Sequence, residues 1–372
     1  MTVTAAKSIM SFWVLPVTVN LNGLATGAMK VNCDHERTLK ATIIPLIQLI
    51  GGITPDCKWA YEKNNSASYI HADISTVSGK DLLRLWGDGA IKLLAGCAPC
   101  QPFSSYQKGK KAVDNNKWKL LDEFSRLVVE TQPDLVTMEN VPQLRDHEVF
   151  LNFRRTLKAN GYHVWSEVVN CLDYGVPQKR QRLVLLASKF GEINLDEPTH
   201  ANNYLTVRDA IGHLPPLEAG QIDKKDPLHA CANLTRINLE RIKQSKQGGT
   251  WEDWDPSLIA NCHKKESGKT YTSVYGRMSW NTPAPTMTTL CFGYGNGRFG
   301  HPVQNRAISL REAAIFQSFP ETYEFLPHSE EVSFTRLGRM IGNAVPVRLG
   351  EVVGESFVKH IQNKLDGHSN GK

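Results

Sequence analysis

Residues 94–105 read Leu-Ala-Gly-Cys-Ala-Pro-Cys-Gln-Pro-Phe-Ser-Ser, and this stretch decides how the rest of the chain is understood. The apolar run 91–95 predicts a buried strand, which ends at a turn containing Gly96 and two prolines. Cys100 stands at this turn, just past the carboxyl end of the strand, where α/β sheets bind ligands and carry out chemistry. A polar loop with several lysines follows at 104–117, so the pattern is that of a nucleophile beneath a loop that can close over it.

The spacing of Cys97 and Cys100 is also that of a redox pair or of half a zinc site. A zinc site needs a second pair of ligands, and the cysteines further along the chain stand singly: Cys171, Cys231, Cys262 and Cys291. A redox C-x-x-C opens a helix, which Pro102 and the polar loop do not fit. From this stretch alone, a buried and unreactive cysteine stays the main alternative.

The composition is that of a chain that can build a core. It has 372 residues, of which 41% are hydrophobic and 22% charged, and this length suits two domains. The net charge of +6 permits a nucleic-acid partner without requiring one. Eight cysteines do not suit a disulfide framework in a chain of this length, so we expect them to be reduced. The apolar segment 8–19 is too short to span a bilayer, and we expect a cytoplasmic chain with no membrane partner.

Apolar periodicity predicts the other elements. Helices are expected over residues 57–65, 119–131, 150–160, 310–317 and 347–364, and strands over 69–74, 134–138, 163–170 and 182–188. Glu139 comes at the carboxyl end of its strand, as Cys100 does, so neighbouring parallel strands would place both side chains in one crevice. In isolation, a glutamate at a strand end is more often a solvated surface residue.

Four short motifs occur in order along the chain. They are Pro99-Cys100-Gln101, Glu139-Asn140-Val141, Gln178-Lys179-Arg180-Gln181-Arg182 and Gly342-Asn343-Ala344-Val345-Pro346. Each alone is weak, but four in this order at these spacings are a strong signal. Over roughly residues 51–360, the chain therefore resembles the DNA cytosine-5 methyltransferase family of bacterial restriction–modification systems.

The resemblance implies an α/β fold: a doubly wound, Rossmann-like, S-adenosylmethionine-dependent methyltransferase domain with a smaller, irregular target-recognition domain. Residues 1–189 would form the catalytic domain, with 1–54 atypical. Residues 190–304, where glycines, prolines and short polar segments replace the βα rhythm, would form the target-recognition domain. Residues 305–372 would return to the catalytic domain. A cytoplasmic, nucleoid-associated prokaryotic monomer is the expected form.

The resemblance assigns the catalytic roles to Cys100, Glu139, Arg180 and Arg182. The thiolate of Cys100 would attack C6 of a cytosine and so activate C5. Glu139, protonated or sharing a proton, would stabilise the charge that develops toward N3, and the two arginines would contact O2 or the phosphate. The base must be flipped out of the duplex, and no metal is needed. The alternative for the arginines is a basic edge strand.

S-adenosylmethionine is the cofactor that the resemblance implies. The residues expected to contact it are Asp73, Ile74, Pro99, Leu120, Asn343 and Ala344. Asp73 and Ile74 would lie beside the adenine, at the end of the predicted strand 69–74. The alternative for Asp73 is a surface aspartate that caps a turn.

The first residues depart from the family pattern. The family opens with a strand and a glycine-rich loop that lets backbone N–H groups approach the cofactor, and an acid further on holds the ribose. In register with Asp73, the loop should fall near residues 28–36, where there is no glycine, and the acid near Gly52 or Thr54. Either the cofactor pocket is degenerate, or residues 1–54 come from a shifted reading frame.

Double-stranded DNA is the partner that the resemblance implies. Contacts are expected from seven residues: Gln101, Ser104, Lys108, Gln178, Arg277, Thr286 and Arg298. Arginines can read guanine edges in the major groove, and lysines of the loop 104–117 would lie near phosphates. A solvated basic region is the alternative for residues 190–304. A cognate restriction endonuclease acting on the same site is a further expected partner.

Two other functions stay open. A DNA-binding homologue that cannot use the cofactor is favoured only by residues 1–54, and the intact motifs argue against it, because a binding module needs no nucleophile. A tRNA cytosine-5 methyltransferase shares the fold and the catalytic cysteine. That branch carries Cys-Phe-Thr in its recognition region, whereas Cys291-Phe292 is followed here by Gly293. We therefore expect a DNA methyltransferase.

Overall fold

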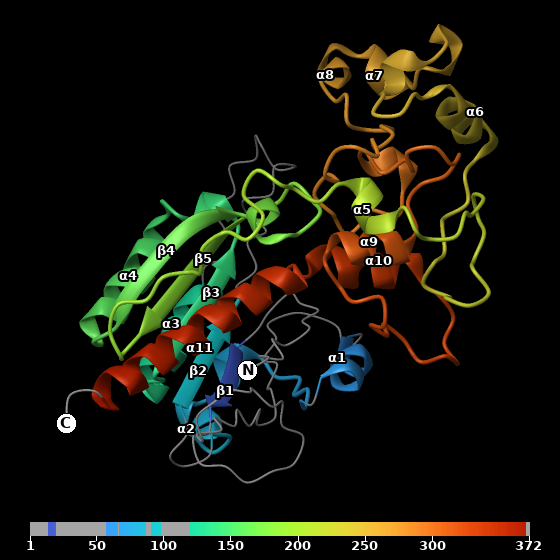
Figure 1. The fold of residues 1–372 in the computed structure, drawn as a ribbon. Coiled ribbons are helices and arrows are strands. Elements are labelled where there is room, and N and C mark those ends of the chain that lie inside the picture. Colours follow the sequence, from blue (N-terminus) through green and yellow to red (C-terminus); the bar gives the residue numbers. More distant parts are fainter. Residues whose placement is uncertain (1–13, 20–56, 66, 87–90, 98–118, 370–372) are drawn as a thin grey trace. The chain divides into compact units, whose positions relative to one another are not determined.

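The computed structural model describes residues 14–19, 57–65, 67–86, 91–97 and 119–369 (Figure 1). The chain divides into two compact units. Unit 1 takes its residues from 1–169, 181–197 and 349–372, and unit 2 consists of 170–180 and 198–348. Within the described ranges, no helix is long and apolar enough to cross a membrane.

A five-stranded sheet forms the centre of unit 1. Its strands lie in the order β1 (Val14–Val19), β2 (Ile91–Gly96), β3 (Leu135–Asn140), β5 (Gln181–Ser188) and β4 (His163–Asn170) (Figure 1). β2 and β3 run parallel, whereas β1 is antiparallel to β2 and β5 is antiparallel to β3, so the sheet is mixed. The four strands predicted from residue 91 onward are confirmed, and part of the apolar segment 8–19 adds the edge strand β1.

Helices α3 (Lys119–Thr131) and α4 (Glu148–Ala159) cover one face of the sheet. Their apolar side chains form one core with Leu183, Leu185 and Ala187, which are alternate residues of β5. Because alternate residues of a strand share a face, this core marks the side on which α3 and α4 pack. Both helices were predicted from apolar spacing and are confirmed, with α4 beginning two residues earlier than expected.

Helix α11 (Val347–Ser369) lies against the opposite face of the sheet. Ser188 follows Ala187 in β5 and therefore points to the other side. The Ser188 hydroxyl and Nε2 of His360 in α11 are 2.8 Å apart, which places the helix on that side (Figure 1). Helices thus cover both faces, and the predicted doubly wound α/β domain is confirmed.

The segment before β2 differs from the prediction. Its short elements are α1 (Lys58–Asn64), η2 (Ile74–Thr76) and α2 (Gly79–Leu83). The helix near residue 58 is confirmed, but the predicted strand 69–74 is wrong, because residues 67–73 have no regular structure and lead into the 3₁₀ turn η2. The carboxylate of Asp73 accepts hydrogen bonds from the N–H and the hydroxyl of Ser75, and such local bonds compete with strand pairing.

Unit 2 is built from short helices and turns. In chain order these are η7 (Cys171–Tyr174), α5 (Val207–Ile211), α6 (Arg236–Gln244), η8 (Trp251–Asp253), η9 (Pro256–Leu258), α7 (Asn261–Lys264), α8 (Glu266–Lys269), η10 (Tyr294–Asn296), α9 (Leu310–Phe316) and α10 (Phe334–Asn343). Unit 1 has one more such turn, η6 (Pro142–Leu144). The predicted domain boundaries at residues 189 and 304 rest on a change in composition and stay predictions, because a compact unit is not the same as a functional domain.

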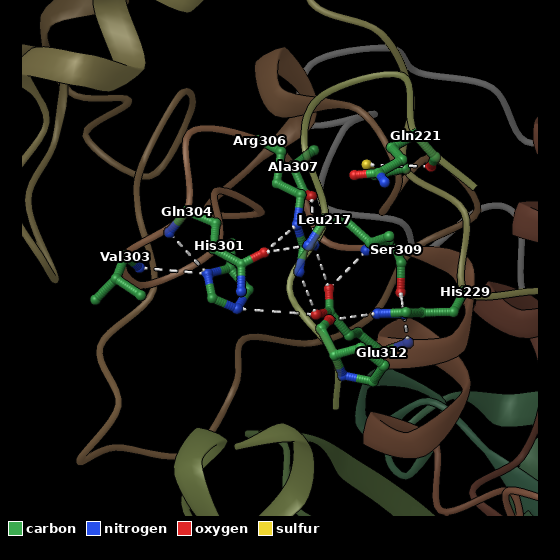
Figure 2. Close-up of polar contacts among 12 residues, drawn as sticks. Leu217, Gln221, His229, His301, Val303, Gln304, Arg306, Ala307, Ser309 and Glu312 are labelled. Atoms are coloured by element: carbon green, nitrogen blue, oxygen red, sulfur yellow. Dashed lines mark hydrogen bonds and ion pairs between the residues drawn. The ribbon is translucent and has the colours of Figure 1, made fainter. Parts of the chain in front are cut away.

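A buried ion pair lies at the start of α9 in unit 2 (Figure 2). Arg306 is fully buried and donates two hydrogen bonds of 2.7 Å to the two carboxylate oxygens of Glu312. Glu312 also accepts from the backbone N–H of Ser309, the N-cap of α9. His229 lies 2.9 Å from the Ser309 hydroxyl, and Nε2 of His301 lies 3.8 Å from Glu312. Removing one partner of such a buried pair costs several kcal/mol, because it leaves the other charge uncompensated, so unit 2 needs both residues together.

Gly96 ends β2 where the strand passes under α3. A Cβ atom at this position would lie 2.7 Å from Cε2 of Phe124. Phe124 has little room to move, because it is 2% exposed and packs on Phe153 with 5.5 Å between ring centroids. We therefore expect Gly96→Ala to lower the free energy of unfolding by about 1–3 kcal/mol. Urea denaturation followed by circular dichroism measures this change.

Gly350→Ala is the matched control for that substitution. Gly350 lies in α11, and among the described residues no heavy atom comes within 4 Å of an added Cβ. The control should leave the midpoint unchanged or raise it, because alanine favours a helix more than glycine does. Equal midpoints for the two variants would mean that α3 does not constrain the end of β2.

The histidine and the glutamate of the buried network have shifted pKa values. Burial lowers the pKa of His301 to about 4. Burial alone would raise the pKa of Glu312, but the hydrogen bonds and charge of Arg306 outweigh it and lower that pKa to about 2. Both groups therefore bind fewer protons in the folded chain, His301 between pH 6.5 and 4 and Glu312 between pH 4.5 and 2. Their contribution to stability is complete above these ranges and is lost as the pH falls through them.

We expect the free energy of unfolding to fall as the pH drops from 6.5 to 4, with about 3 kcal/mol of the loss due to His301. His301→Gln removes this titration, so its unfolding free energy should depend less steeply on pH in that range. Urea titrations at a series of pH values measure both slopes. His328→Gln serves as the control, because the His328 side chain is 90% exposed. The same slope for wild type and His301→Gln would contradict the assignment.

Candidate functional site

Five of the predicted site residues lie outside the described part of the chain: Pro99, Cys100, Gln101, Ser104 and Lys108. The described chain reaches the candidate site along β2 and includes Cys97, the residue directly after this strand. The site is therefore built here from Cys97, from the neighbouring strands and from the remaining predicted residues.

Glu139 lies on the strand next to β2. In the parallel pairing of β2 with β3, Gly96 is the partner of Met138, so one step further Cys97 comes beside Glu139. The predicted parallel neighbourhood of the two strands is confirmed, whereas the predicted meeting of Cys100 with Glu139 lies outside the described residues. The Cys97 thiol donates a hydrogen bond of 3.0 Å to Oε2 of Glu139. The solvated alternative for Glu139 does not hold, because its side chain is only 14% exposed.

Arg182 approaches Glu139 from the other neighbouring strand. In the antiparallel pairing of β3 with β5, Glu139 is the partner of Val184, and Arg182 is two residues away on the same face. Nε of Arg182 lies 2.5 Å from Oε1 of Glu139. Both side chains are 14% exposed, so water screens this ion pair less than a surface pair. Three neighbouring strands thus supply a thiol, a carboxylate and a guanidinium to one cluster.

Asp73, predicted to contact the cofactor, caps the turn η2. Its Oδ1 accepts from the N–H of Ser75 at 2.9 Å and from the Ser75 hydroxyl at 2.8 Å. Both hydrogen bonds lower the pKa of Asp73, and the bond from the backbone N–H of Ser75 has the larger effect. The exposed carboxylate of Asp73 is therefore ionised at neutral pH. Ile74 is fully buried and belongs to the core of unit 1. The geometry is that of the turn-capping alternative, and it leaves a charged acceptor on the surface.

Arg126 of α3 fixes the backbone of this turn. Its Nη2 donates to the carbonyls of Ile74 at 3.0 Å and Val77 at 2.9 Å. Ion pairs with Glu123 and Glu130 hold the guanidinium in place at 2.7 and 2.9 Å. Sequence reasoning missed this residue. The spacing of its two glutamates on the helix was a signal for the ion pairs, but nothing in the sequence indicated the two distant carbonyls.

The other predicted cofactor residues have different surroundings. Leu120 of α3 is half-buried and packs against the core of unit 1. Asn343 is exposed at the end of α10. Ala344 is fully buried, and its carbonyl accepts from Nε2 of Gln317 at 3.1 Å.

Gln178 has a structural role that the sequence did not indicate. Its side chain is fully buried, and its Nε2 donates at 2.7 Å both to the carbonyl of Phe316 and to the side chain of Gln317. Its Oε1 accepts from the N–H of Met287 at 2.9 Å. The predicted DNA contact of Gln178 is corrected, because both of its amide hydrogens are bonded inside unit 2.

Arg180 is also buried, with 5% exposure. It donates to the carbonyl of Met287 at 3.0 Å and to that of Ala344 at 3.4 Å. The residues near it in the sequence do not form the edge strand considered as an alternative, because β5 begins only at Gln181. Gln178 and Arg180 therefore tie three distant segments of unit 2 together.

The predicted DNA contact of Arg277 is also corrected. It is 3% exposed, and all five of its N–H donors are bonded within unit 2. Four of the acceptors are backbone carbonyls, those of residues 242, 245, 301 and 304, and the fifth is the side chain of Asn305. No N–H of Arg277 is left for a guanine edge.

Two predicted DNA residues lie nearer the surface. Thr286 is exposed and its hydroxyl donates to the carbonyl of Lys179. Arg298 is half-buried, and its Nη1 donates to the carbonyls of Gly248 at 2.6 Å and Gly249 at 2.9 Å. Among the described residues, no group of three or more His, Cys, Asp or Glu side chains could hold a metal ion.

Several known proteins are similar to this chain in sequence. The sequence profile described as "C-5 cytosine-specific DNA methylase" matches residues 50–359. The type II methylase M.HgiDII of Herpetosiphon aurantiacus is 53% identical over 312 residues, which are 83% of this chain and 87% of that protein. The type II methyltransferase M1.HphI of Haemophilus parahaemolyticus is 34% identical over 304 residues, covering 79% and 76% of the two chains.

Solved structures agree in fold. One, described as a DNA modification methyltransferase encoded within a prophage of E. coli, matches with a TM-score of 0.62 at 20% identity, covering 85% of this chain and 92% of that one. The Dnmt2 methyltransferase of S. pombe matches with a TM-score of 0.52 at 16% identity. From the profile match and the 53% identity, the chain belongs to the C-5 cytosine-specific DNA methylase family and is a DNA cytosine-5 methyltransferase of the type II restriction–modification kind.

Proposed function

We propose that this methyltransferase modifies C5 of a cytosine flipped out of duplex DNA, through a covalent bond between Cys100 and C6, with S-adenosylmethionine as the methyl donor. The cluster of Cys97, Glu139 and Arg182 carries the proposal. The cluster brings together a thiol, a largely buried carboxyl group and a guanidinium from the ends of three neighbouring strands. Cys100 follows Gly96, the last residue of β2, by four residues in the sequence.

C5 of cytosine is a poor nucleophile, and Cys100 would overcome this. Its thiolate forms a bond to C6, and the electrons of the C5–C6 double bond move onto C5 and toward N3. After C5 has been methylated, loss of the C5 proton restores the double bond and expels the thiolate. The base has to leave the stack for these steps, so a flipped cytosine is the form that reacts.

Glu139 would stabilise the charge that develops toward N3 by sharing a proton there. Its carboxyl group is held by Arg182 on one oxygen and by Cys97 on the other, which supports a fixed orientation. We assign Arg182 to O2 of the base or the phosphate. Arg180 would act indirectly, because its guanidinium donates to the carbonyls of Met287 and Ala344.

The described residues fit the adenine end of S-adenosylmethionine, which when bound supplies an electrophilic methyl group. Asp73 presents an exposed, ionised carboxylate, and among the described residues none bonds its second oxygen, Oδ2. This oxygen would accept from the exocyclic amine of an adenine. Ile74 would fix the turn by its burial, and the remaining assigned contacts are Pro99, Leu120, Asn343 and Ala344.

DNA binding is assigned to residues of two regions. The first is the sequence segment that contains Gln101, Ser104 and Lys108. The second contains Thr286, which is exposed, and Arg298, which is half-buried. A cognate restriction endonuclease that cleaves the same site, unless it is methylated, would be the biological counterpart.

Cys100→Ala tests the mechanism. We expect methyl transfer to a DNA substrate to fall by at least about a thousandfold, because no thiolate is left to activate C5. Binding of the same DNA should persist, because Cys100 is not among the residues assigned to DNA contact. Transfer of a radiolabelled methyl group and gel-shift titration measure the two quantities. Wild-type activity in Cys100→Ala would overturn the mechanism.

Asp73→Asn tests the assignment of the adenine contact. The amide lacks the charge, so we expect binding of S-adenosylmethionine to weaken about 5- to 30-fold, measured by calorimetry. Asp255→Asn is the matched control, since Asp255 caps η9 through the N–H and hydroxyl of Ser257 just as Asp73 does through Ser75. Equal cofactor affinity in both variants would remove Asp73 from the site.

A further inference from the structure

We propose that Cys97 is a positioning residue of this methyltransferase, whose thiol holds the Glu139 carboxyl group in its working orientation. The inference rests on the proposed function, in which Glu139 meets N3 of the cytosine. Its observation is the hydrogen bond of 3.0 Å from Cys97 Sγ to Glu139 Oε2.

The backbone places this thiol with little freedom. β2 and β3 are paired in parallel from Leu93 with Leu135 to Gly96 with Met138, so Cys97 and Glu139 continue the same register. Side chains paired in this way point to the same side of a sheet. The strand register therefore places the Cys97 side chain next to that of Glu139.

The carboxyl group of Glu139 is held from two sides. Arg182 Nε lies 2.5 Å from Oε1, and the Cys97 thiol bonds Oε2. Rotation of the carboxyl group would lengthen the ion pair or break the hydrogen bond, so the two contacts together restrict its orientation. Arg182 alone would leave the group free to turn about the Oε1 contact.

A thiol suits this position better than a charged donor. A thiol is a weak, neutral donor, so this bond adds an orienting contact without placing a second positive charge beside the guanidinium of Arg182. Cys97 thus orients the Glu139 carboxyl group without adding a charge of its own.

Four proteins test the role: wild type, Cys97→Ala, Cys97→Ser and Cys231→Ala. Cys231 is the matched control, because its buried thiol donates to the carbonyl of Glu218 at 2.8 Å in unit 2. We expect Cys97→Ala to lower kcat about tenfold, with KM for S-adenosylmethionine and for DNA unchanged. Cys97→Ser keeps a donor and should retain most of kcat, and Cys231→Ala should retain all of it.

The decisive measurement is a double-mutant cycle with Glu139→Ala, followed by single-turnover transfer of a radiolabelled methyl group. If Cys97 acts through Glu139, adding Cys97→Ala to Glu139→Ala should cost no further rate. Melting temperatures measured for every variant separate a folding defect from this effect.

Three outcomes would overturn the inference: an unchanged kcat in Cys97→Ala, a loss that is the same with and without Glu139, or a serine variant as slow as the alanine variant. Cys100→Ala in the same assay separates the two proposals. If it remains active, the covalent mechanism fails. If it is inactive while Cys97→Ala equals wild type, only the role of Cys97 fails.

Discussion

The parallel pairing of β2 with β3 is the constraint on which the candidate site depends. It fixes Gly96 opposite Met138 and thereby brings the residue after β2 beside Glu139. The register cannot slip by one residue without turning every side chain of the strand to the other face, where the core that faces α3 would be lost. The close approach of α3 to Gly96 adds a second restraint at the same point. The same strand register therefore determines both the packing of the core and the geometry of the candidate site.

Much of unit 1 could be predicted from the sequence, because apolar periodicity reports on burial. The strands from residue 91 onward and the helices α3 and α4 follow that rule. The segment 69–74 is the exception. There the side chain of Asp73 accepts hydrogen bonds from Ser75 in the following turn, and the backbone does not pair with a neighbouring strand. Such local side-chain bonds decide short segments, and hydrophobic spacing does not register them.

The predicted site was harder to obtain for a different reason. Gln178 and Arg277 were assigned to DNA from the family resemblance, yet both are buried. Their partners come from segments far apart in the sequence, and no local pattern reveals a distant carbonyl. Cys97 was considered only as a partner of Cys100, although the strand register would have pointed to Glu139. Motifs identify which residues matter, but they do not separate those that meet the substrate from those that support the fold.

Arg277 bonds almost only to the main chain, and this has an evolutionary consequence. A carbonyl oxygen is the same whichever side chain its residue carries, so four of the five bonds survive substitution of the partner residues. Natural selection can therefore change the exposed side chains of unit 2 while its frame persists. An arginine whose partners are backbone atoms thus leaves the exposed side chains around it free to diverge.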